Sequence, residues 1–193
     1  MLLQHNAAYA ITELLDIISV TTFKEFSKRL GKAASKQDPD LYDPSAYKGD
    51  GFEVFVEFFL KFFNGDHTLT YTADYEPNME YDNGIDGRGR CTFGGDNVVQ
   101  AKYKSDPSKY LSNDDNISNV VAAAVGEGLV PDFDKKNVII VTSCKGVHPK
   151  HAMIPAHCIN GEQIARRVDQ NEVFWSDFKS VLQDTIHAYE NQR

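Results

Sequence analysis

Hydrophobic and polar positions divide the chain into recognisable elements. Apolar residues recur at three-to-four spacing over residues 6–34, which predicts a helix that Gly31 would end. Residues 35–51 are rich in Pro, Gly and Asp, so we expect a linker or surface loop there. We therefore expect an N-terminal helical extension with its linker over residues 1–47, to which we assign no chemistry, and a main domain over residues 48–193.

The segment 52–63 is apolar at every position except Glu53, Glu57 and Lys61. These three residues are spaced by four, so on a helix they form one narrow polar stripe. A helix that is otherwise apolar all round must be buried. Its polar stripe must then face water or a polar site.

The pattern after residue 63 alternates between strands and helices. Strand-like alternation covers 68–75 and 98–103, and a turn-rich segment, 82–89, lies between them. Further on we predict a helix over 112–127 with Ser112 and Asp115 as a capping box, a fully buried strand over 137–143, a short strand over 156–159, and helices over 161–168 and 172–189. This order predicts an α/β sandwich with a mixed sheet.

Composition narrows the class of protein. A chain of 193 residues, 41% of them hydrophobic, can form one domain with a sizeable core, and a net charge of −8 excludes a histone-like coat for nucleic acid. Cys91, Cys144 and Cys158 are too few and too widely spaced for a disulfide scaffold. Glu57 and Lys61 interrupt the Phe-rich segment, so we expect no membrane span. Because the N-terminus also lacks the basic region of a signal peptide, we expect a cytoplasmic location.

Candidate chemistry lies on the strand predicted over 98–103. Because strand side chains alternate in direction, Gln100 and Lys102 project from the same face. Upstream, Asp86 lies in a glycine-flanked segment where the backbone can bend close to a ligand. Carboxylate and amide oxygens suit a hard cation such as Mg²⁺, and a nearby lysine can orient a water or offset charge that builds up on phosphorus.

These residues resemble a known family. Glu53, Gly84-Ile85-Asp86 and Gln100-Ala101-Lys102 are similar to the helix Glu, the Asp and the QxK of PD-(D/E)xK nucleases, in particular the Mrr-like restriction endonuclease branch. The resemblance covers roughly residues 50–170, and two further segments share it, the strand 138–143 and the segment 159–164. The chain departs from the usual pattern at Ile85, where Pro is common in this branch, and at Gln100, which stands for the second acid.

The segments 49–60 and 84–89 also resemble the nuclease-like module that precedes the motor in some large phage and viral DEAD/DEAH-type helicases. No GxxxxGK[ST] phosphate-binding motif occurs in the sequence, so a motor would lie elsewhere. This resemblance implies a helicase partner and, for a phage protein, the host cytoplasm.

The resemblance implies a restriction-endonuclease-like core, αβββαβ, with a mixed central sheet flanked by helices. The implied activity is Mg²⁺-dependent hydrolysis of DNA, with Mn²⁺ able to substitute. Asp86, Gln100 and the carbonyl of Ala101 would hold the metal, and Lys102 would position the attacking water. The helix ligand would be Glu53 or, as second choice, Glu57. A fold with a single site needs two copies to cut both strands, which leaves a homodimer open.

Several cations are candidates for contacts to DNA phosphates: Arg88, Arg90, Lys104, Lys109 and Lys145. Each is also a plain surface charge on the simpler interpretation.

Two other interpretations stay open. The same fold could grip DNA or a partner protein with cleavage weak or lost. A zinc site is a weaker hypothesis. The spacing of its candidate ligands does not match the spacings known for zinc sites: Cys144, His148, His151, His157 and Cys158. Phe174, Trp175 and Phe178 are predicted to be helix core. No motif in the sequence predicts the DNA sequence preference, the preferred form of DNA or the number of metal ions.

Overall fold

A computed structural model describes most of the chain: residues 2–9, 20–69, 72–78, 84–91, 94–112, 115–126, 128, 137–151, 154 and 156–191. Its elements are η1 (Asn6–Tyr9), α1 (Phe23–Ala34), α2 (Pro44–Phe62), β1 (Thr72–Pro77), β2 (Gly87–Cys91), β3 (Asp96–Lys102), α3 (Ile117–Gly126), β4 (Val138–Thr142), η4 (Pro149–His151), β5 (His157–Ile159), α4 (Gly161–Val168) and α5 (Glu172–Glu190). The predicted α/β class is confirmed.

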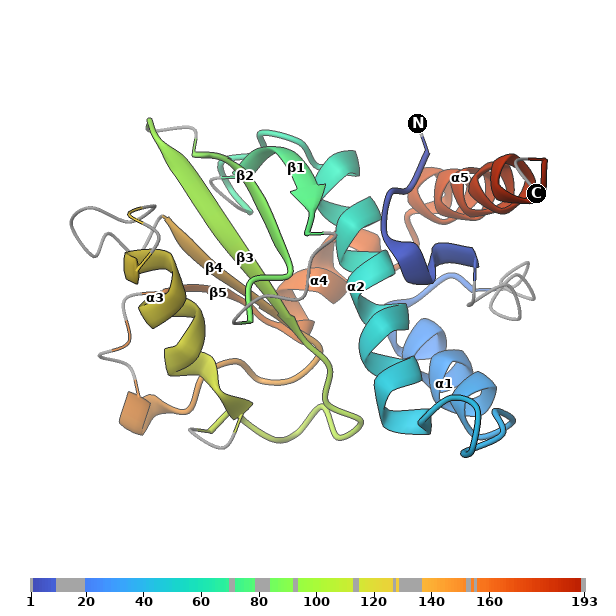
Figure 1. Ribbon diagram of the computed structural model, residues 1–193, viewed down its shortest axis with the longest axis horizontal. Helices are drawn as coiled ribbons and strands as arrows, with labels where there is room; N and C mark the ends of the chain where they lie inside the picture. Colours follow the sequence, from blue (N-terminus) through green and yellow to red (C-terminus); the bar gives the residue numbers. More distant parts are fainter. Residues whose placement is uncertain are drawn as a thin grey trace.

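The centre of the fold is a mixed five-stranded sheet with strand order β1-β2-β3-β4-β5 (Figure 1). β1, β2 and β3 are antiparallel neighbours, whereas β3, β4 and β5 run parallel, with Gln100 opposite Ile140 and Lys102 opposite Thr142. Helix α3 covers one face of the sheet, and α1, α2, α4 and α5 lie on the other (Figure 1). The sheet therefore separates two hydrophobic clusters.

Helix α2 begins earlier than the sequence pattern predicted. Asp43 caps the helix by accepting hydrogen bonds from the amides of Ser45 and Ala46, and Pro44 occupies the first turn, where its missing N–H costs nothing. The loop predicted over 35–51 is therefore wrong from Pro44 onward. The 47/48 boundary falls inside this helix.

The glycine that suggested a loop serves helix packing instead. A Cβ at Gly51 would lie 2.4 Å from a methyl group of the buried Leu30, so a larger residue here would require Leu30 to shift. Phe26 of α1 stacks on Phe55 of α2 with ring centroids 4.8 Å apart and meets Phe178 of α5 at 6.1 Å. Helix α1 is thus part of the same core as the main domain.

The C-terminal helices follow their predicted patterns. Phe174, Trp175 and Phe178 are buried in the core, as predicted, and the Trp175 indole donates to the Val168 carbonyl at 2.7 Å. No helix in the described ranges is both long enough and apolar enough to cross a membrane.

Several other boundaries differ from the predictions. Helix α1 continues past Gly31, where it was predicted to end, as far as Ala34, and β1 covers Thr72–Pro77 where a strand was predicted over 68–75. Helix α3 starts at Ile117 instead of residue 112, because Asn116 adopts a left-handed φ of 56° that a continuous helix cannot contain. The predicted N-terminal helix is represented by η1 and α1, whose N-cap is Thr22, and residues 10–19 lie outside the described part.

Candidate active site

Asp86, which immediately precedes β2, makes two hydrogen bonds to the main chain of β3. Its amide donates to the Val99 carbonyl at 2.9 Å, and its carboxylate Oδ2 accepts the Ala101 amide at 2.7 Å. The carboxylate thus takes the place that a β2 carbonyl would occupy in the ladder. Because both main-chain groups of one strand residue point to the same neighbour, the Ala101 carbonyl also faces this edge.

The pKa of the Asp86 carboxyl group is raised toward neutral pH. Burial raises its pKa, and the charge of Glu53 raises it further, whereas the Ala101 amide and the Lys102 ammonium act in the opposite direction. The net result is a pKa of about 7. A perturbed carboxyl beside a second acid and a lysine is a frequent feature of functional sites.

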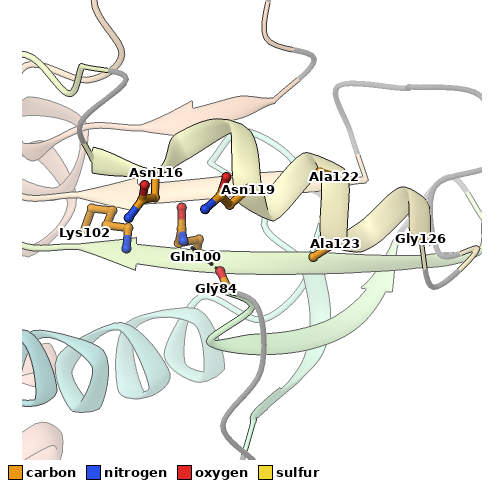
Figure 2. A pocket seen from close by; sticks show the side chains of 8 residues that line it. All are labelled: Gly84, Gln100, Lys102, Asn116, Asn119, Ala122, Ala123 and Gly126. Carbon is orange, nitrogen blue, oxygen red and sulfur yellow. Dashed lines mark hydrogen bonds between the residues drawn. The ribbon is translucent and has the colours of Figure 1, made fainter.

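Gln100 and Lys102 project from β3 toward α3, as the strand alternation predicted (Figure 2). The Gln100 Nε2 donates to the Gly84 carbonyl at 2.8 Å. Its Oε1 points toward α3, is buried and has no hydrogen-bond partner among the described residues. A buried acceptor left without a partner is costly, so this oxygen is a candidate ligand atom.

Gly84 is required at its position. Its φ of 94° lies in the left-handed region, and a Cβ there would lie 2.9 Å from the Gln100 Nε2. The glycine that precedes Ile85-Asp86 in the sequence therefore fixes the orientation of the Gln100 side chain.

A cavity of about 710 Å³ opens between β3 and α3. Figure 2 shows the residues that line it: Gly84, Gln100, Lys102, Asn116, Asn119, Ala122, Ala123 and Gly126. The sequence interpretation missed Asn116 and Asn119, whose side chains reach toward Gln100 and Lys102 (Figure 2). The signal available in the sequence was that these two asparagines interrupt the apolar pattern of the helix predicted over 112–127.

The two glutamates of the α2 stripe have different environments. Glu57 is fully buried, accepts the main-chain amides of Gln4 and His5 at 2.7 and 3.0 Å, and pairs with Lys61 at 2.5 Å. Its oxygens are thus committed to docking the N-terminal segment. Glu53, one turn earlier, retains 27% side-chain exposure and lies close enough to raise the pKa of Asp86.

His5 holds Glu53 in place. Its Nε2 lies 2.9 Å from the Glu53 Oε2, while its Nδ1 accepts the Ala7 amide at 3.1 Å. Because Nδ1 is an acceptor, the ring proton of neutral His5 is on Nε2 and is donated to Glu53. Burial works to lower the pKa of His5, but the hydrogen bond and the charge of Glu53 outweigh it and raise the pKa.

The segment that carries His5 lies between α2 and α5 (Figure 1). The Leu3 amide donates to Thr185 Oγ1 of α5 at 2.9 Å. The sequence interpretation assigned no chemistry to residues 1–47, and no local pattern pointed to His5.

The candidate phosphate contacts fall in two places. Arg88 and Arg90 are exposed on β2, where Arg90 pairs with Asp74 at 2.6 Å. The remaining three lie in loops that follow β3 and β4. There Lys104 pairs with Asp115, and the Lys145 amide bonds to the Lys109 carbonyl at 3.0 Å. The structure therefore does not gather the five predicted cations on one surface.

The donor atoms near Asp86 are few but of the type that Mg²⁺ prefers. Within the described residues, no group of three or more His, Cys, Asp or Glu side chains is placed to hold a metal ion. The carboxylates of Asp86 and Glu53 and the unpartnered Oε1 of Gln100 are nonetheless oxygen donors suited to a hard cation.

Comparisons of the chain with family models, with curated proteins and with solved structures found no match.

Proposed function

We propose that this protein is a Mg²⁺-dependent DNA nuclease with a restriction-endonuclease-like core of the PD-(D/E)xK type. One observation carries the proposal. The carboxylate of Asp86 is fixed to the main chain of β3 at Ala101, between Gln100 and Lys102, and its pKa is raised to about 7. A strand cap alone gives no reason for a second acid close enough to raise this pKa, whereas a metal-binding site does.

The residues of the site fit a magnesium ion. Asp86, the Gln100 Oε1 and the Ala101 carbonyl would hold it, with Glu53 acting directly or through water. When bound, Mg²⁺ supplies charge that stabilises a phosphate oxygen and lowers the pKa of a water. The repulsion between Asp86 and Glu53, which raises the pKa of Asp86, is the kind of strain that a divalent cation relieves.

The protein groups would act on the substrate as follows. Lys102, at the end of β3, orients the attacking water and offsets negative charge on the phosphate in the transition state. His5 holds the Glu53 carboxylate in place through its Nε2 proton. Asp86 must be ionised to bind a cation, so the protein works best above the pKa of this carboxyl.

The test is nicking of supercoiled plasmid in Mg²⁺, Mn²⁺ or EDTA. We expect metal-dependent nicking that falls by at least about 100-fold in Lys102→Ala, the loss expected when a transition-state charge partner is removed. Lys150→Ala removes an exposed lysine of η4 and is the matched control. Circular dichroism of each variant verifies that the fold is retained. A wild-type protein without nicking in any metal would overturn the proposal.

A second candidate is a DNA-binding module of the same fold that does not cut. It is favoured by one observation: a glutamine stands where a second acid would complete a three-carboxylate group, and none forms among the described residues. Such a module would shift DNA in gels equally with Mg²⁺ and EDTA, with a steep salt dependence.

A further inference from the structure

A second cavity, of about 780 Å³, lies where the three parallel strands end. The residues that follow β3, β4 and β5 form one side of it, among them Tyr103, Lys145 and Gly161. Helix α1 forms the other side, with Lys24 and Lys28. Ligands commonly bind at the carboxyl ends of parallel strands, because the loops there converge while the strands hold them rigidly.

The wall that follows β4 is braced by short hydrogen bonds. The Ser143 hydroxyl accepts the Lys104 amide at 2.7 Å and donates to the Lys104 carbonyl at 2.9 Å. The Gly161 amide donates to the Cys144 carbonyl at 2.9 Å, and a Cβ at Gly161 would meet the Ser143 carbonyl at 2.4 Å. The cavity is therefore built into the fold and needs no ligand to form.

Cations dominate the charge around this cavity, although the whole chain carries −8. Lys24, Lys28 and Lys145 have no ion pair among the described residues, and each lines the cavity. Its two carboxylates are engaged elsewhere: Glu162 pairs with Arg166, and Asp169 accepts the Phe23 amide at 2.8 Å. The free positive charge suits an anionic ligand.

The cavity also offers an aromatic face. Tyr110 lines it and remains 40% exposed, unusually open for a large ring, with the Lys145 ammonium 5.6 Å from its centroid. Tyr103 lies deeper and is fixed by a hydrogen bond of 3.3 Å to the Ser27 carbonyl. A ring beside lysines recognises a base and its phosphates at the same time.

We propose that this cavity binds an unpaired stretch of nucleic acid, with phosphates on Lys24, Lys28 and Lys145 and a base against Tyr110. The choice of nucleic acid rests on the proposed nuclease function. The two sites share β3: Lys102 lines the cavity beside α3, and its neighbour Tyr103 lines this one. A strand held here continues over the end of β3 to the candidate active site. This defines the substrate class as DNA with a single-stranded segment.

The test is fluorescence anisotropy of a labelled eight-nucleotide oligothymidine and of a blunt duplex, in EDTA so that no cleavage occurs. We expect the oligothymidine to bind at least about 10-fold more tightly than the duplex, because an unpaired base can stack on an aromatic ring. Tyr110→Ala should weaken it by roughly 5- to 100-fold, the range for one lost stack. The double variant Lys24→Glu/Lys28→Glu should weaken binding strongly and flatten the salt dependence of the binding that remains.

The matched control is Lys36→Glu/Lys150→Glu, which makes the same charge change at two exposed lysines outside the cavity. Equal binding of duplex and oligothymidine, or equal losses in the control and the cavity variants, would overturn the inference. Repeating the titration and the plasmid nicking assay with Asp86→Asn separates the two proposals, because this variant should lose nicking and leave oligothymidine binding unchanged. Oligothymidine binding by a protein that never nicks DNA would retain the cavity as a binding site and reject the nuclease.

Discussion

His5 donates its Nε2 proton to the Glu53 carboxylate across 2.9 Å, which joins the start of the chain to the first acid of the α2 stripe. The ring cannot turn freely, because its Nδ1 accepts the Ala7 amide and its own amide is bound by Glu57. Two contacts thus fix the imidazole, and a third fixes the main chain that carries it. Glu53 is held by this histidine at the place from which it raises the pKa of Asp86.

Replacement of His5 should impair the candidate site without unfolding the protein. Partners that orient a metal-binding or catalytic carboxylate are typically worth about 10- to 100-fold in activity or metal affinity, so His5→Ala should lower the nicking rate by at least about 10-fold. His5→Gln, which retains an N–H donor, should recover part of the loss. Equal rates for His5→Ala and wild type would show that Glu53 needs no positioning.

Substitution of Glu57 should lower stability, whereas substitution of Glu53 should lower activity. Glu57→Ala leaves Lys61 and two main-chain amides without their buried partner, so we expect a loss of about 3 kcal/mol in unfolding free energy. Glu53→Ala, at a partly exposed side chain, should leave stability nearly unchanged and reduce nicking. Urea unfolding and plasmid nicking on both variants measure the two effects. A fully stable Glu57→Ala protein would contradict the assigned structural role.

The stability of the metal-free protein should depend on the ionisation of Asp86. Its pKa is raised from 3.8 to about 7, so its contribution to stability is fully present below pH 3.8 and is lost as the pH rises through 7. Asp86→Asn keeps an acceptor for Ala101 but carries no charge. The variant should therefore melt higher than wild type at pH 8 in EDTA, and the difference should vanish toward pH 4.

The size of this effect is measurable by calorimetry. A shift of about three pKa units corresponds to about 4 kcal/mol, and each kcal/mol moves the melting temperature of a domain this size by roughly 2–4 °C, so a rise of roughly 8–16 °C is the upper expectation. Asp177→Asn removes an exposed carboxylate of α5 and is the control. A difference between wild type and Asp86→Asn that stays constant from pH 4 to 8 would contradict the raised pKa.

Gly84→Ala should disturb both backbone and site. The left-handed φ of 94° costs an alanine about 1–3 kcal/mol, and the new Cβ would displace the Gln100 amide from 2.9 Å. Gly94→Ala is the matched control, since its φ of 106° imposes similar strain where no atom of the described residues lies within 4 Å of an added Cβ. Both variants should lose stability, and only Gly84→Ala should lose nicking activity. Nicking lost equally in both would assign the effect to backbone strain.

Local patterns predicted much of the fold. The strand β4 and the helices α4 and α5 lie within one residue of their predicted bounds, because apolar periodicity and caps coincide there. Asn160, for example, forms a capping box with Gln163 at the start of α4. The beginning of α2 was missed because Pro44, Gly49 and several Asp are typical of loops. In the structure Pro44 lies in the first helical turn, which tolerates it, and Gly51 faces Leu30 of α1, a long-range contact.

The candidate site was predictable only where one strand carries it. Gln100 and Lys102 share a face, as alternation along β3 requires. The choice between Glu53 and Glu57 was not predictable, because both lie on the same helical stripe and differ only in which part of residues 2–9 covers them. His5 was missed for the same reason: its role depends on a contact with a residue 48 positions away.

The hydrogen bond between Leu3 and Thr185 joins residues 182 positions apart, and this separation affects when the N-terminal segment can dock during translation. Translation makes Leu3 well before it makes α5. Until α5 has emerged from the ribosome, the segment that carries His5 lacks the helix against which it docks. The acidic stripe of α2 therefore exists before its histidine is secured, and the candidate site matures only after nearly all of the described chain has emerged.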